Sequence, residues 1–196
     1  TIPARLWRNV FGIQLESKWM NNKLNAVVFY KNYDYQAESI DFFQREVTSL
    51  PLREVKDNFH GYGLALKYQL SPSLFIRGSY EQSTRIPTEF EIFGDFVTII
   101  PNYTLKPETS DNINLGLHFE KNNPDGVNYY FKLDGFIRNQ RDLIRLNGFD
   151  FEFGIHENED RVDGKGVEFS TEKSWKDYLK VRGNFTFQSN KITTPP

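Results

Sequence analysis

The chain has 196 residues, of which 16% are aromatic and 26% charged, with a formal net charge of −2 and no cysteine. The balanced charge gives no basic surface for nucleic acid, and the lack of cysteine excludes disulfides, thiolate metal sites and a cysteine nucleophile. No run of about 18 apolar residues is present, which excludes a transmembrane helix but not transmembrane β-strands, because these need only alternating apolarity over about 10 residues. Many rings among many charges favour a sheet with one apolar and one wetted face.

Apolar side chains recur at every second position along most of the chain, which predicts strands rather than helices. The pattern is clear between Asp111 and Glu120, where apolar residues at odd positions alternate with polar residues or glycine at even ones. In the second segment two sets of apolar positions compete, so its facing stays open. We predict an all-β fold, an antiparallel up-and-down meander of about eight strands, at residues 6–18, 23–36, 58–70, 73–83, 110–120, 126–139, 164–175 and 178–189.

The connections between these strands alternate strictly in length. Short connections lie at 19–22, 71–72, 121–125 and 176–177, and long ones at about 37–57, 84–109 and 140–163. Because successive antiparallel connections lie at opposite ends of a sheet, all the long ones share one rim. This is the layout of outer-membrane barrels, whose long loops are extracellular. The rings that would suit interfacial girdles at the strand ends are Trp7, Trp19, Tyr33, Tyr68, Trp175 and Tyr178.

A soluble eight-stranded barrel has the same alternation, with its polar residues outward. Its interior holds only side chains or one small ligand. That space is too small for most of the 18 Phe, 10 Tyr and 3 Trp side chains together with the aliphatic ones. The rings therefore favour a barrel whose apolar face meets lipid.

Two adjacent blocks carry a more specific pattern, YEQSTRIPTEFEIFG from Tyr80 and PNYTLKPETSDNINLGLHF from Pro101. They resemble the barrel of TonB-dependent outer-membrane receptors, in which an Arg-x-Pro turn precedes an acidic-aromatic stretch and a Pro-Asn…Leu-Lys-Pro-Glu block enters the next strand. The resemblance covers most of residues 60–189. The matching positions are Arg85, Pro87, Glu89, Phe93, Gly94, Pro101, Asn102, Leu105, Lys106, Pro107, Glu108, Ser110, Asn112, Leu115 and Gly116.

The resemblance implies that the chain is a section of the wall of a transmembrane barrel of roughly 22 strands, in the outer membrane of a Gram-negative bacterium. It implies a transporter rather than an enzyme, whose parent imports a scarce nutrient such as a ferric siderophore, haem, cobalamin or a glycan. We expect residues 1–196 to be a partial barrel domain, without the family's plug domain, its TonB box or the closing C-terminal strand. The alternative is a small complete outer-membrane barrel that acts as an adhesin or structural protein.

The expected partners are outer-membrane lipid, an imported small ligand at the extracellular loops, and TonB only through the missing plug; no nucleic acid and no cofactor are expected. Loops 84–109 and 140–163 are predicted to face outward and to help capture the ligand, because binding residues concentrate on loops held by a rigid scaffold. Packing among the loops is the competing interpretation, and Arg85, Lys106 and Glu108 are expected to shape the rim. The candidate ligand contacts are Arg85, Glu89, Phe90, Phe93 and Phe96.

Other chemistry is weakly represented. His60, His118 and His156 have no metal-ligand spacing and accompany no serine–aspartate pair, so no catalytic residue, metal ligand or cofactor-binding residue is predicted. The acidic run from His156 to Asp163 lacks the spacing of a calcium loop and is interpreted as a solvated loop tip.

Overall fold

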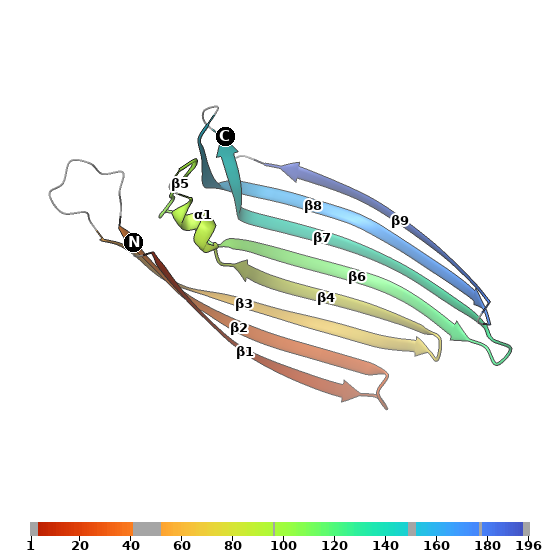
Figure 1. The fold of residues 1–196 in the computed structure, drawn as a ribbon. Helices are drawn as coiled ribbons and strands as arrows, with labels where there is room; N and C mark the ends of the chain where they lie inside the picture. Colours follow the sequence, from red (N-terminus) through yellow and green to blue (C-terminus); the bar gives the residue numbers. More distant parts are fainter. Residues whose placement is uncertain (1–3, 41–51, 96, 149–151, 177, 194–196) are drawn as a thin grey trace.

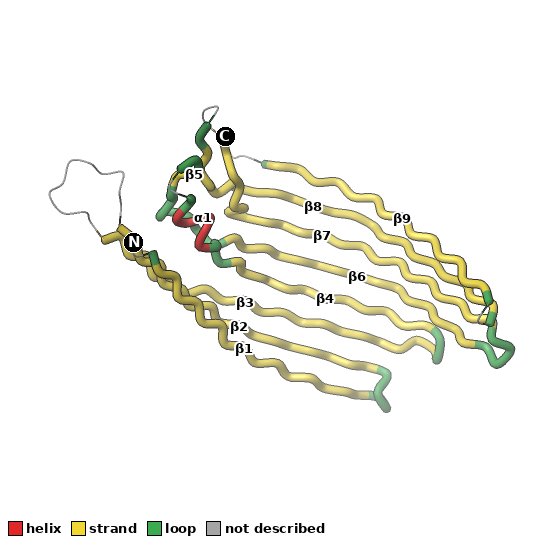
Figure 2. Tube along the Cα trace, viewed as in Figure 1, coloured by secondary structure: helices red, strands yellow, loops and turns green. Residues whose placement is uncertain are grey.

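The period-two pattern produces a single curved sheet of nine strands (Figure 1). The computed structural model describes residues 4–40, 52–95, 97–148, 152–176 and 178–193. Figure 2 shows that strands make up nearly all of the described chain. They are β1 (Arg5–Trp19), β2 (Leu24–Ile40), β3 (Leu52–Ser71), β4 (Leu74–Arg85), β5 (Ile99–Ile100), β6 (Glu108–Asn122), β7 (Val127–Gly148), β8 (Gly154–Trp175) and β9 (Leu179–Ile192), with one short helix, α1 (Glu89–Phe93).

The long strands follow one another around the sheet as an antiparallel meander, in the order β1-β2-β3-β4-β6-β7-β8, with β9 paired to β8. The predicted all-β meander is therefore confirmed. Within the described ranges β1 pairs only with β2 and β9 only with β8, so the sheet is open on both sides. No helix in the described part of the chain is long and apolar enough to span a membrane.

The structure corrects the predicted long connections. Residues 140–148 and 154–163 are not a loop, because they belong to β7 and β8, which stay paired as far as Gly148 opposite Gly154. The acidic run from His156 to Asp163 likewise lies in β8 rather than at a loop tip. Polar side chains accompany the backbone ladder here, such as those of Asn147 and Glu157, which form a hydrogen bond. The alternation of apolar residues therefore disappears while the pairing continues.

The connection between β4 and β6 also contains more structure than expected. It includes α1 and the two-residue strand β5, which pairs in parallel with β8, so the prediction of eight purely antiparallel strands missed one short strand. At the other long connection, β2 extends to Ile40 and β3 begins at Leu52, which shortens the predicted 37–57 loop from both sides.

The pairing register separates the two faces of the sheet. Leu117 of β6 lies opposite Leu133 of β7, which lies opposite Phe169 of β8 and, through it, Phe185 of β9. These residues belong to one apolar face, and the other face is polar. The register also settles β2, whose Leu24, Ala26, Val28 and Tyr30 lie opposite Tyr68, Leu66, Leu64 and Tyr62 on the apolar face.

Aromatic residues lie at both margins of the apolar face. Tyr62 and Tyr80 are neighbours near the rim of the long connections, and Trp19, Tyr68 and Trp175 lie near the short turns. This is the arrangement that girdles at two membrane interfaces require. Tyr33 was a wrong choice for a girdle, because it lies on the polar face with its ring against Gly61.

The polar face contains a compact charged cluster near the middle of β4, β6 and β7. The Asp134 carboxylate contacts Arg77 Nη2 at 3.2 Å, His118 Nε2 at 3.1 Å and Lys132 Nζ at 2.7 Å. A Cβ at position 116 would lie 2.0 Å from Asp134 Oδ1, so only glycine leaves room for this carboxylate. The glycine of the Leu-Gly pair at 115–116 therefore has a local structural reason.

The assignment of faces predicts that arginine at two neighbouring positions of β6 lowers the stability of the intact receptor by very different amounts. Leu115→Arg should destabilise the protein by about 2–4 kcal/mol, because it moves a charge into the lipid-facing band, whereas Asn114→Arg should cost little. Reversible denaturant unfolding in lipid bilayers measures both changes. Equal costs for the two variants would show that the faces are misassigned.

Candidate functional site

The connection between β4 and β6 folds into a compact unit at the rim of the long connections (Figure 1). Thr88 caps α1: its hydroxyl accepts the N–H of Glu91, and the Glu91 carboxylate accepts the N–H of Thr88 at 2.7 Å. This reciprocal capping box satisfies two backbone donors that would otherwise lack partners. A helix of one turn can form here because both of its ends are bonded to neighbouring groups.

A tight turn follows the helix. Gly94 has φ of +63°, and a Cβ there would lie 2.0 Å from the Ile99 carbonyl oxygen. Asp95 Oδ1 accepts the N–H groups of Val97, Thr98 and Ile99 at 2.7–2.8 Å, and its Oδ2 accepts the Thr98 hydroxyl. These bonds hold the pKa of Asp95 well below its usual range. The bond from the Ile99 N–H has the largest effect, followed by the bond from the Val97 N–H.

Apolar packing fixes the unit against the first two long strands. Ile92 and Phe93 are buried against Ala37 of β2, with Leu6 of β1 and Tyr103 packed beside them. Since Ala37 is on the polar face of the sheet, the connection lies over the polar face rather than over the apolar one.

Arg85, the last residue of β4, joins the unit to its flanking strands. Its guanidinium donates to both Glu108 oxygens, at 2.7 and 2.5 Å, and to both Glu91 oxygens, at 3.0 and 3.1 Å. Glu108 Oε1 also accepts the N–H of Ile144 in β7 at 2.8 Å. Burial alone would raise the pKa of Glu91, but hydrogen bonds from Arg85 and Thr88 outweigh it and lower that pKa.

Asparagine side chains join the same unit to β8. Asn158 donates to the Lys106 carbonyl and accepts the Lys106 N–H, both at 2.9 Å, and it also donates to the Asp142 carbonyl. Asn102 donates to the His156 carbonyl at 2.7 Å. Lys106 was expected to shape the rim; its bonds to Asn158 are made by its backbone.

The five candidate ligand contacts occupy different environments. Arg85 is engaged with two carboxylates, and Phe93 is buried in the packing cluster. Glu89 is exposed and contacts Arg8 of β1 at 3.3 Å. Phe90 is 52% exposed, with its ring edge-on to His156 at 5.8 Å between centroids. Phe96 lies outside the described residues.

The rim thus presents Glu89 and Phe90 at an accessible surface, with the ring of the buried His156 beside that of Phe90. Sequence reasoning missed Asn158, Asn102 and Arg8 as partners in this unit. Their contacts join segments far apart in the chain, so no local sequence pattern predicts them. Within the ranges that the structure describes, no group of three or more His, Asp or Glu side chains could hold a metal ion.

The architecture and the rim unit can now be compared with known proteins. A family model described as the TonB dependent receptor-like β-barrel matches residues 29–196. The chain belongs to this family. Membership places it in the outer membrane of a Gram-negative bacterium, and the receptors of this family are transporters rather than enzymes. No curated protein sequence matches the chain.

Solved structures of receptors share the fold. The copper transporter OprC aligns with a TM-score of 0.75 and 13% identity, covering 96% of this chain and 30% of that one. The siderophore receptor PirA from Pseudomonas aeruginosa aligns with a TM-score of 0.59 and 14% identity, covering 95% of this chain and 41% of that one. The alcaligin outer-membrane receptor FauA from Bordetella pertussis aligns with a TM-score of 0.57 and 14% identity, covering 96% of this chain and 31% of that one. The chain therefore spans less than half the length of each of these receptor chains.

Removing the guanidinium of Arg85 should loosen the rim unit of the TonB-dependent receptor. Arg85→Ala leaves Glu91 and Glu108 without their shared cation, and we expect a loss of about 1 kcal/mol of local stability, because the half-exposed pairs are partly screened by solvent. Hydrogen–deuterium exchange of residues 86–107 in the intact receptor measures this change. Lys106→Ala is the matched control and should leave exchange unchanged, since Asn158 bonds only the backbone at Lys106.

The turn at Asp95 should persist in acid. Because the pKa of Asp95 is lowered in the folded state, its contribution is full above the ordinary aspartate pKa of about 3.9 and is lost as the pH falls from there through the folded value. Amide exchange at Thr98 and Ile99, compared with Asp95→Ala at each pH, should show protection from pH 7 to about 4 and its loss only below. Equal exchange in the two proteins at neutral pH would refute this role.

Proposed function

We propose that the parent protein imports a scarce nutrient, with a ferric siderophore or other metal compound favoured over haem, cobalamin or a glycan. The favoured class is supported by the similar structures, whose names describe a copper transporter, a siderophore receptor and a ferric-catecholate import receptor. In this proposal residues 1–196 form one section of the barrel wall and part of the ligand-binding rim. The outer membrane holds no ATP, so transport is driven through TonB, which engages a plug domain elsewhere in the parent.

The observation that carries this proposal is the folded connection 86–107. Its described residues form a rigid unit, capped at its helix, packed against Ala37 of β2 and hydrogen-bonded to β8, yet Phe90 is left half-exposed beside His156. A rigid scaffold that presents an exposed ring with little loss of side-chain freedom suits ligand capture. Glu89 adds a carboxylate next to the ring, and Arg8 holds it at 3.3 Å.

The roles of the candidate residues therefore differ. Phe90 would stack on a flat part of the ligand, and Glu89 would accept hydrogen bonds from it. Phe93 would support the unit from below, where it is buried, and Arg85 would hold the unit to β4 and β6.

A single substitution separates ligand capture from packing. Phe90→Ala in the intact receptor should weaken binding of the transported ligand about fivefold to tenfold, as loss of one stacked aromatic contact of about 1 kcal/mol implies. Isothermal titration or cell-uptake assays measure this effect. Phe185→Ala is the matched control: its ring is similarly exposed but lies on the apolar face of β9, and ligand binding should be unchanged.

Barrel assembly, measured by heat-modifiable migration in gels, should be intact in both variants. If Phe90→Ala assembles normally and binds the ligand with unchanged affinity, this part of the rim serves packing alone and the binding site lies in other parts of the parent.

A further inference from the structure

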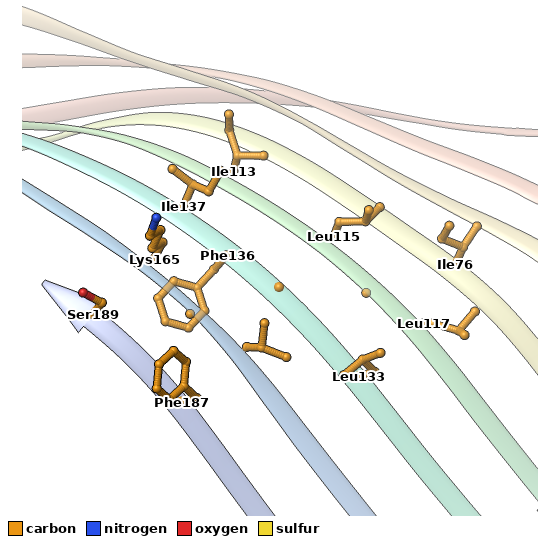
Figure 3. A pocket seen from close by; sticks show the side chains of 14 residues that line it. Ile76, Ile113, Leu115, Leu117, Leu133, Phe136, Ile137, Lys165, Phe187 and Ser189 are labelled. Atoms are coloured by element: carbon orange, nitrogen blue, oxygen red, sulfur yellow. The ribbon is translucent and has the colours of Figure 1, made fainter.

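An apolar hollow of about 750 Å³ opens on the apolar face over β4, β6, β7, β8 and β9 (Figure 3). It forms around Gly135, where a Cβ would meet no atom closer than 4.0 Å, so this position leaves open space among large neighbours. Leu115 and Val167 lie directly opposite Gly135 on its two sides. The volume is in the range of small-molecule sites, about 300–1,000 Å³.

The hollow is not uniformly apolar. Its lining ends in Lys165 and Ser189, which lie opposite each other on β8 and β9 toward the rim of the long connections. One step further along the strands, about 7 Å away, Lys191 lies opposite Asp163. A cation therefore stands where the apolar lining stops.

Further cations continue in the same direction on the same face. Arg141 of β7 lies directly opposite Arg161 of β8, a like-charge pair that is unfavourable unless anions are near. Each arginine has one carboxylate, Arg141 with Asp111 at 2.6 Å and Arg161 with Asp163 at 2.8 Å.

These two carboxylates do not neutralise the whole patch. Lys165 and Lys191 form no ion pair within the described residues, so the patch of Arg141, Arg161, Lys165 and Lys191 with Asp111 and Asp163 keeps a net charge of about +2. By contrast, Lys173 at the short-turn end of the same face lies over the rings of Tyr129 and Trp175, at 5.2 and 4.3 Å.

We propose that this hollow and its cationic patch bind one phosphorylated, multiply acylated lipid of the outer leaflet. The acyl chains occupy the hollow around Gly135, and a headgroup phosphate lies between Lys165 and Lys191. Both parts of the site face the bilayer, and the cations lie at the rim end, where an outer-leaflet headgroup is. The match of an apolar hollow to chains and of unpaired lysines to phosphate selects this occupant. The orientation rests on the outward-facing rim of the proposed function.

Native mass spectrometry of the intact receptor in detergent tests the proposal. The probe is diphosphorylated lipid A, compared with the same lipid after removal of both phosphates. We expect the receptor to retain one phosphorylated lipid in preference to the dephosphorylated one. Lys165→Gln combined with Lys191→Gln should lower affinity for the phosphorylated lipid by roughly tenfold or more and remove the preference.

A matched control makes the same change in charge on the opposite face. Lys31→Gln with Lys67→Gln removes two lysines that lie on the polar face, beside Phe29 and Phe75, and should leave lipid binding unchanged. Gly135→Leu fills the hollow and should weaken binding of both lipids. Nutrient binding should be normal in all these variants, so failure of the lipid site is distinguishable from failure of the proposed function.

Three results would overturn the proposal. Equal retention of the two lipids would show that the lysines do not recognise the phosphate and only contact the polar headgroup region. Displacement of the lipid by millimolar inorganic phosphate alone would indicate a free-anion site, and a receptor dimer lost in Gly135→Leu would show that a second copy occupies the hollow.

Discussion

The structure depends on the backbone hydrogen-bond ladder between long antiparallel strands. In the hydrocarbon region of a bilayer no water can satisfy a free N–H or carbonyl group, so each strand needs a neighbour along its whole apolar length. From β2 to β8 every long strand has two such neighbours, whereas β1 and β9 each have one. The faces, the girdles and the hollow all follow from this register, because it decides which side chain lies next to which. Within the described residues the outer edges of β1 and β9 are unpaired, and exposed edges of this kind invite pairing with further strands.

The sequence contained enough information to predict the wall. In β6 and β9 the alternation of leucine and phenylalanine with polar residues identified both the strands and the lipid side, because lipid imposes that alternation directly. Where lipid does not act, the same reasoning failed. In the outer part of β7 and β8 the paired residues include Arg145 opposite Glu157, so no apolar period marks the strands although the ladder continues. β2 was ambiguous for another reason: its polar face carries Phe29 and Tyr33, whose rings lie over Gly63 and Gly61 of β3.

The rim unit could be predicted only in part. The motif residues Arg85 and Glu108 were expected at the rim, and they do meet there. The partners that complete the unit, such as Asn158 and Arg8, come from β8 and β1. Their contribution arises from tertiary contacts across 52 and 81 residues of sequence, and nothing in their local sequence reveals it. The same distinction applies to Phe90 and Phe93, which are three residues apart in one helical turn, yet one is half-exposed and the other is buried.

The folded connection has a mechanical consequence for the wall that carries it. It contacts Leu6 and Ala37 on β1 and β2, and through β5 and Asn102 it is bonded to β8, so it joins the two sides of the arc that the sheet describes. It therefore ties the two sides of the arc together at the outer end. Lower in the wall no such connection exists within the described residues, and strand twist determines the curvature there. A molecule that pressed on Phe90, the exposed ring of this unit, would therefore act on both sides of the arc as well as on a single loop.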